Sequence, residues 1–303
     1  AIFYSSGHRT GFTDDHCMYS YRNTRAHNSI LVNGMTQKIG TEGYGWIPRW
    51  YEGEKIAYMI GDASNAYGKV TSPLWLKRGK LSGTQYTPEK GWDENKLDMF
   101  RRHIIQLGTT GVFVIYDELE GKEAVTWSYL LHTVELPMEI QELTDEVKVI
   151  GKNKAGGVSV AHLFSSAKTE QAMVDTFFCA PTNWKNVTNA QGKALKYPNH
   201  WHFSSTTVPC KTARFLTVMD THGKNRPDMQ VVRKGNTIQV GDWTITCNLT
   251  EKGKAAIYVS NKTEKVSLNY DAGKKEGATI VTDQVKGKQV NKVLTDYLPD
   301  FEI

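Results

Sequence analysis

Short runs of alternating apolar and polar residues recur along this chain of 303 residues, and they limit its fold more than any other feature. Val266, Leu268 and Tyr270 alternate with polar residues, and Trp243–Cys247 repeats the pattern. Successive side chains of a strand point to opposite faces, so each run predicts a strand with one buried face. No long stretch shows the period of about 3.6 residues that a helix requires.

About fifteen segments have this character, and most are separated by turn residues such as Gly and Asn. Connections of hairpin length predict antiparallel pairing, and so many strands do not fit in one open sheet. The sequence therefore predicts an all-β fold, a large, antiparallel, multi-stranded β-sandwich of the supersandwich type. The predicted strands are Ser29–Asn33, Lys55–Ile60, Phe100–Leu107, Val112–Asp117, Val125–His132, Val147–Ile150, Val158–Phe164, His200–Ser204, Arg214–Met219, Gln230–Arg233, Thr237–Val240, Trp243–Cys247, Ala256–Ser260, Val266–Tyr270 and Thr279–Thr282.

Three segments are predicted to lie outside the strands. Tyr44–Glu54 and Gly83–Lys96 are polar and rich in Trp and Tyr, which is typical of long surface loops, and Thr169–Val174 is predicted to form a helical turn. Loops on a rigid sandwich are common binding sites. Aromatic rings stack on sugars, so Trp46 and Trp50 are candidate substrate-binding residues.

The domain prediction places one large β-sandwich at residues 1–261 and a possible small β-unit at residues 262–303, where Lys, Val and Thr become more frequent. The chain opens on the apolar run Ala1–Tyr4 without an initiator Met, so we expect it to be part of a longer protein. No apolar run reaches about 18 residues, and no membrane span is predicted.

The charge balance is mildly basic, with 37 Lys and Arg against 32 Asp and Glu and a net charge of +5. Nucleic-acid-binding proteins usually concentrate basic residues in a stripe. The densest basic cluster here, Lys77–Lys80, is flanked by apolar residues and is predicted to be a solvated loop. No nucleic-acid partner is therefore predicted, whereas a diffuse positive charge suits an acidic polysaccharide.

The sharpest local pattern is Thr24–Gln37, in which a His-Asn pair opens an apolar strand and an Asn-Gly turn closes it. A histidine at a strand entrance can bind a metal or transfer a proton. Its ring can equally hold a nearby carbonyl group by a hydrogen bond. The residues alone leave both roles open for His27.

This stretch resembles the heparinase II/III-type polysaccharide lyases, in the β-sandwich region that follows their helical toroid domain. Their element is similar to the His-Asn-Ser-Ile-Leu-Val-Asn-Gly-x-x-Gln written here. Ala1–Gly7, Phe100–Ile104, Phe113–Asp117 and Trp127–His132 resemble neighbouring strands of the same family. The matching motifs cover roughly the first 135 residues.

The resemblance implies β-elimination on an acidic, uronic-acid-containing polysaccharide, in the periplasm or outside the cell. Such a reaction needs a base at the C5 proton, an acid for the leaving oxygen and neutralisation of the carboxylate. In the family, the helical domain supplies much of this apparatus. It is expected to belong to the same protein and to be missing from this chain, which would then lack most of the catalytic groups.

The resemblance also implies a set of cleft residues near the start of the chain. His16 and Tyr19 fall in the family's His/Tyr-rich connector and are the candidate catalytic residues. Arg9 and Arg22 are the candidate substrate-binding residues, because a guanidinium group presents a planar pair of donors to a carboxylate or sulfate.

His27 matches a metal-ligand histidine of zinc-containing relatives, which implies a structural divalent metal, zinc or calcium. Ser5 stands where those relatives have the Asp ligand, and a serine hydroxyl is a poor zinc ligand. A structural role for His27 is therefore the alternative. His200 and His202 are predicted to share a strand face, where ordinary packing is favoured over metal binding because no third ligand is evident.

Two other functions stay open. A non-catalytic carbohydrate-binding or scaffold module fits the loss of the Asp ligand. A sugar mutarotase-like epimerase has a related fold, but it needs a histidine and a carboxylate that face one pocket. The sequence does not locate such a pair.

Overall fold

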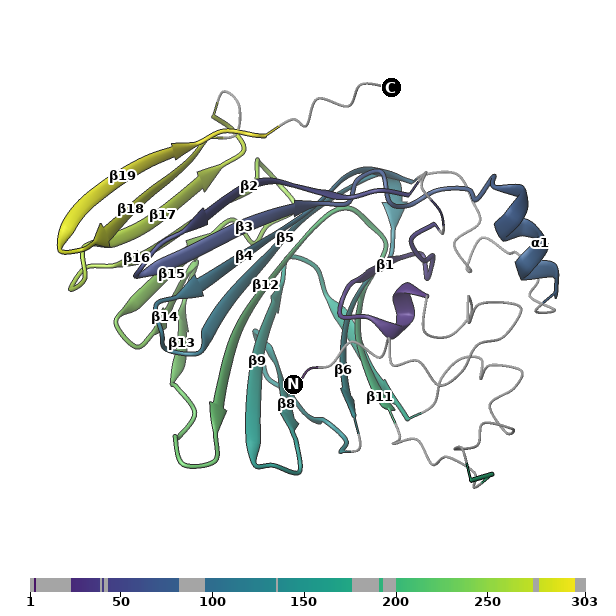
Figure 1. The fold of residues 1–303 in the computed structure, drawn as a ribbon, viewed down its shortest axis with the longest axis horizontal. Coiled ribbons are helices and arrows are strands. Elements are labelled where there is room, and N and C mark those ends of the chain that lie inside the picture. The colour runs from purple at the N-terminus through teal and green to yellow at the C-terminus, as the bar shows by residue number, and fades with distance from the viewer. Residues whose placement is uncertain are drawn as a thin grey trace.

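The computed structural model describes residues 3, 23–38, 40, 43–81, 96–134, 136–175, 191–192, 200–274 and 278–297. The described residues form three antiparallel sheets of four, eight and seven strands (Figure 1). This confirms the predicted all-β, multi-stranded sandwich.

The eight-stranded sheet is the central layer, and its strands follow the order β2 (Trp46–Glu52), β3 (Ile56–Asp62), β4 (Leu97–Leu107), β5 (Val112–Val125), β12 (Cys210–Gly223), β9 (Gly157–Ser165), β8 (Val147–Lys152) and β7 (Glu139–Glu142). The four-stranded sheet has the order β1 (Ile30–Val32), β6 (Trp127–Val134), β11 (His200–Thr207) and β10 (Thr169–Val174). The seven-stranded sheet runs in sequence order through β13 (Val231–Lys234), β14 (Thr237–Val240), β15 (Trp243–Cys247), β16 (Ala256–Asn261), β17 (Val266–Asp271), β18 (Thr279–Val285) and β19 (Lys288–Leu294). The described helical elements are the 3-10 turn η1 (Thr24–Ala26) and helix α1 (Pro73–Leu81).

The fifteen predicted strands all fall on strands of the structure, but three other predictions are wrong. Tyr44–Glu54 is not a loop, because it contains β2, whose pattern is obscured by Pro48 and a bulge. Thr169–Val174 is not a helical turn but strand β10, at the edge of the four-stranded sheet. Lys77–Lys80 lies in helix α1, which begins at Pro73, a residue favoured in the first turn. Of Gly83–Lys96, residues 83–95 are outside the described part.

The predicted domain boundary at residue 262 falls in the turn between β16 and β17. These two strands pair along their whole length, from Ala256 opposite Asp271 to Asn261 opposite Val266. The seven-stranded sheet therefore runs across this position. Within the described ranges, no helix has the length and apolar character needed to cross a bilayer.

Each face of the central sheet is covered by a different sheet, and the two covers meet different halves of its strands. On β4, Phe100 packs in the core beneath the four-stranded sheet, whereas Ile105 and Leu107 pack in the core beneath the seven-stranded sheet. On β5, Leu119 belongs to the first core and Tyr116 to the second. The middle of β4 and β5 is thus where one apolar core ends and the other begins.

Charged residues occupy the middle of β4 and β5, between the two apolar cores. Arg101 lies opposite Glu118 and Arg102 lies opposite Asp117, in neighbouring positions of the β4–β5 register. Arg102 binds the fully buried Asp117 through two hydrogen bonds, Nε to Oδ1 at 2.6 Å and Nη2 to Oδ2 at 3.0 Å. A buried carboxylate is tolerated only when it is paired and hydrogen-bonded, so removal of Arg102 alone would leave an uncompensated charge in the centre of the sheet.

We predict that Arg102→Met lowers the free energy of unfolding by about 3–5 kcal/mol, because it leaves the carboxylate of Asp117 buried without its cation. Urea denaturation of the chain measures the loss. Lys96→Met is the matched control, since the Lys96–Glu123 pair is exposed and should cost no more than about 1 kcal/mol. Equal losses in the two variants would contradict the prediction, and Arg102→Met combined with Asp117→Leu should recover most of the stability.

Candidate functional site

The His-Asn element forms a short, tightly held segment that leads into β1. The side chain of Asn23 caps η1 by accepting a hydrogen bond from the backbone N–H of Arg25, and His27 ends the turn by donating its backbone N–H to Thr24. After β1, Asn33 and Gly34 turn the chain with positive φ angles of 50° and 70°, as the predicted Asn-Gly turn requires.

His132, on β6, anchors both sides of His27. Its Nε2 donates to the carbonyl oxygen of Arg25 at 2.7 Å, so the Nδ1 of the neutral ring is an acceptor, and it lies 3.0 Å from the side-chain amide of Asn28. The ring of His202, on β11, stands edge-on to His132 at 4.6 Å between centroids, because the two residues are directly opposite in the β6–β11 register. His27 itself is half-buried, so one buried histidine holds a partly accessible one in place.

Burial keeps the rings of His132 and His202 neutral. Burial first, and then the nearby rings of His202, His27 and His200, lower the pKa of His132 to about 3, against the hydrogen bond to the backbone of Arg25. Burial lowers the pKa of His202 to about 4, against an opposing hydrogen bond with the backbone of Arg25. His132 and His202 are therefore neutral at ordinary pH and carry no fixed positive charge for an anionic ligand.

Arg102 provides the second anchor of the element. Its Nη1 donates to the carbonyl oxygen of Asn28 at 2.8 Å while its other nitrogens hold Asp117. The guanidinium group also lies over the ring of Tyr129, at 5.5 Å from the centroid. The segment before β1 is thus fixed to both the central sheet and the four-stranded sheet, which gives His27 a defined position.

The structure leaves several predicted site residues untested. Ser5, Arg9, His16, Tyr19 and Arg22 lie outside the described residues, and their roles stay predictions.

The two predicted tryptophans lie on β2. Trp46 is half-buried, and Trp50 is 57% exposed and meets Tyr297 edge-on at 6.2 Å between ring centroids. No contact between either tryptophan and His27 is found among the described residues. Trp50 instead lines an apolar cavity of about 500 Å³ together with Ile47 and Met59.

A metal at His27 has little support from the described residues. No group of three or more His, Cys, Asp or Glu side chains in this part of the chain is arranged to hold a metal ion. His200 and His202 lie on one face of β11, as predicted, and both are buried. The described donor set does not fit a metal centre, so the metal stays a prediction and no step below depends on it.

Sequence reasoning missed the residues that hold the element, namely His132 and Arg102. Arg102, Asp117 and His132 all fall in segments that resemble the lyase family, which was the available signal. Their roles depend on pairing between distant strands, and no local pattern reveals that pairing.

We predict that acidification weakens the fold through these histidines. The unfolded chain protonates His202 near its ordinary pKa of 6.5, whereas the fold keeps the ring neutral down to about 4. Its contribution to stability is therefore complete above about pH 6.5 and is lost as the pH falls toward 4. In His202→Gln, the fall in unfolding free energy between about pH 6 and pH 5 should be smaller by about 1 kcal/mol.

Urea denaturation at the two pH values tests this, with Ser204→Ala as a control that removes no titrating group from β11. An unchanged pH dependence in His202→Gln would show that the ring does not resist protonation in the fold.

The comparisons with known proteins concern the fold. No family model matches the sequence, and no curated protein matches it. Among solved structures, the heparinase III BT4657 gene product with methylated lysines is similar over 89% of this chain, with a TM-score of 0.54 and 13% identity. A crystal structure of heparinase III is similar over 97% of the chain, with a TM-score of 0.52 and 13% identity. This chain spans 34% of the length of each. It has a heparinase-like fold, as its sequence motifs predicted.

Proposed function

We propose that this chain is the β-sandwich portion of a polysaccharide lyase that cleaves a uronic-acid-containing polysaccharide, heparin- or heparan-like or another acidic glycan, by β-elimination. The likeness to heparinase III over 97% of the chain is the observation that supports it most. The likeness concerns the fold, so the catalytic roles are argued from individual residues.

On this proposal, the described residues build one wall of the cleft. His132 and Arg102 fix the backbone on either side of His27 through Arg25 and Asn28, which gives the half-buried ring a single position. Fixed positioning of this kind is worth large rate factors, because a displacement of about 1 Å can cost about 100-fold.

The rest of the machinery is proposed to come from groups outside the described residues. Elimination needs a base at C5, an acid at the leaving oxygen and a cation at the carboxylate. His16 and Tyr19 are proposed for proton transfer, and Arg9 and Arg22 for binding the carboxylate or sulfate. A helical domain of the same protein would supply the remaining groups, and the protein is proposed to work in the periplasm or outside the cell.

The test uses the full-length protein that contains this chain, with heparan sulfate, hyaluronan and alginate as substrates. We expect new absorbance from a 4,5-unsaturated uronate on at least one of them. His27→Ala should lower kcat/KM by about 10- to 100-fold, the range for lost positioning. His222→Ala is the control, because that ring bonds to Gly223 and Asp228 instead.

Absence of the double bond on every acidic glycan would refute the lyase. Lower stability of His27→Ala with unchanged turnover per folded molecule would assign His27 a structural role only.

A non-catalytic glycan-binding role has one observation in its favour, the exposed aromatic pair Trp50 and Tyr297 beside an apolar cavity. If this surface binds a glycan, Trp50→Ala should weaken binding of heparan sulfate oligosaccharides about two- to tenfold, which is the worth of one aromatic contact. Calorimetry measures the change. Tyr258→Ala, at an exposed aromatic of β16, is the control, and equal affinities of the two variants would exclude the surface.

A further inference from the structure

A polar cavity of about 470 Å³, distinct from the apolar cavity at Trp50, opens on the face of the central sheet that the seven-stranded sheet covers. It lies on the opposite face from Arg102 and Asn28, because Arg101 and Glu118 line it and successive residues of a strand point to opposite faces. Its size is within the roughly 300–1,000 Å³ of small-molecule sites. The site is therefore separate from the one at His27.

A row of alternating charges crosses four strands of the central sheet, and its two middle members, Arg101 and Glu118, line this cavity. Asp62 on β3 lies opposite Arg101 on β4, Arg101 opposite Glu118 on β5, and Glu118 opposite Arg214 on β12. Directly opposed residues share a face, so acid and base alternate along the row. Arg101 donates a hydrogen bond from its Nε to Asp62 at 2.9 Å. Its two terminal nitrogens take no part in that bond.

The buried end of the cavity holds Glu118 in a fixed position. Tyr270 donates its hydroxyl to Glu118 at 2.7 Å, and the Nε2 of the buried His103 lies 3.7 Å from the same oxygen. Tyr58 in turn contacts Nδ1 of His103 at 3.0 Å. His103 thus supports Glu118 from behind, but it is fully buried and does not line the cavity, so this histidine and carboxylate do not both face one pocket.

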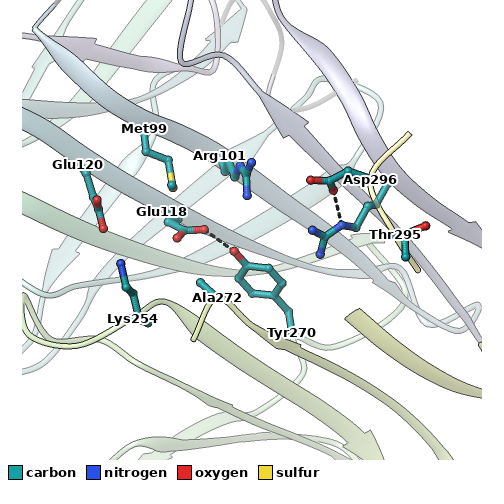
Figure 2. Close-up of a pocket in the computed structure, with 10 residues that line it drawn as sticks. Met99, Arg101, Glu118, Glu120, Lys254, Tyr270, Ala272, Thr295 and Asp296 are labelled. Carbon is teal, nitrogen blue, oxygen red and sulfur yellow. Dashed lines mark hydrogen bonds and ion pairs between the residues drawn. The ribbon is translucent and has the colours of Figure 1, made fainter. Parts of the chain in front are cut away.

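The open end presents groups with spare hydrogen-bonding capacity. Figure 2 shows Glu120 and Lys254 pointing toward each other at one side of the cavity, with Glu118 beside them and hydrogen-bonded to Tyr270. The Nη2 atom of Arg214 lies 3.7 Å from Oε1 of Glu120, which is beyond hydrogen-bond distance. The Nε and Nη2 atoms of that buried Arg214 have no hydrogen-bond partner among the described residues.

The charges of the cavity select the class of ligand. Three basic residues, Arg49, Arg101 and Lys254, are matched by three acidic ones, Glu118, Glu120 and Asp296. Arg49 and Asp296 pair with each other, which leaves two cations and two carboxylates. A sulfate, phosphate or uronate would meet the two carboxylates, and a metal ion would meet the two cations. A hydroxyl group both donates and accepts, so neighbouring hydroxyls satisfy carboxylates and cations together.

Apolar surface completes the match. Met99, Ala272 and the ring of Tyr270 line the same cavity, and such surfaces pack against the C–H faces of a sugar ring. We propose that this cavity binds a neutral mono- or disaccharide. Glu118 and Glu120 accept from its hydroxyls, and Arg101 and Lys254 donate to them.

The test uses the full chain with N-acetylglucosamine, glucose, mannose and cellobiose, and with glucuronate as the charged comparison. Saturation-transfer NMR and calorimetry should detect at least one neutral sugar at concentrations up to about 10 mM. Lys254→Met combined with Glu120→Gln should weaken that sugar at least about tenfold, because it removes charge-assisted hydrogen bonds. Glucuronate should bind at least about tenfold more weakly than the neutral sugar, because it meets the two carboxylates.

The matched control is Lys252→Met with Glu251→Gln, which makes the same changes at exposed positions outside the cavity. It should bind as the unaltered chain does, and equal melting temperatures of the two double variants would confirm intact folds. The proposal is overturned if no neutral sugar binds, if the cavity variant binds as tightly as the control, or if glucuronate binds more tightly than the neutral sugars.

Discussion

The group of four charged residues at the middle of β4 and β5 is the constraint on which the rest of the structure depends. Each strand passes there from one apolar core to the other, and the residues at the crossing are Arg101 and Arg102 on β4 and Asp117 and Glu118 on β5. Because neighbouring side chains point to opposite faces, the Arg102–Asp117 ion pair lies on one face, and Arg101 lies on the other, where it pairs with Asp62 and stands opposite Glu118. Burial of these charges is costly unless every one is paired, and the bidentate contact of Arg102 with Asp117 meets that condition.

The same four residues fix the register of β4 against β5. The register in turn fixes the geometry of the segment at His27 and of the polar cavity. A slip of one residue between β4 and β5 would move every side chain of one strand to the other face and would separate Arg102 from Asp117. Arg102 donates a hydrogen bond to the backbone carbonyl of Asn28, and Glu118 accepts one from the hydroxyl of Tyr270 on β17. The segment at His27 and the cavity beneath the seven-stranded sheet are therefore positioned by adjacent residues of the same two strands.

The sequence predicts features set by a few neighbouring residues, such as strands. It does not predict contacts that depend on which strands pair. Strands such as Val266–Asp271 were found because alternation within a few residues reveals a buried face. β2 was missed because Pro48 and a bulge interrupt its alternation, and β10 because an edge strand has little apolar signal. The His27 element was located, but its anchors His132 and Arg102 were not, since those contacts join residues that lie far apart in the chain.

The offset between the two covering sheets also explains why the molecule has two unlike open surfaces. The seven-stranded sheet stops before Met99 and Arg101, and the uncovered part of that face is polar, with charges that face a cavity. The four-stranded sheet stops before Ile104, and the uncovered part of the other face is apolar and carries Trp50 and Met59. Water satisfies exposed charges at little cost, whereas an exposed apolar face gains free energy when it is covered. The polar opening is thus stable as it stands, and the surface around Trp50 is the one whose burial by a ligand or another part of the protein would gain the most.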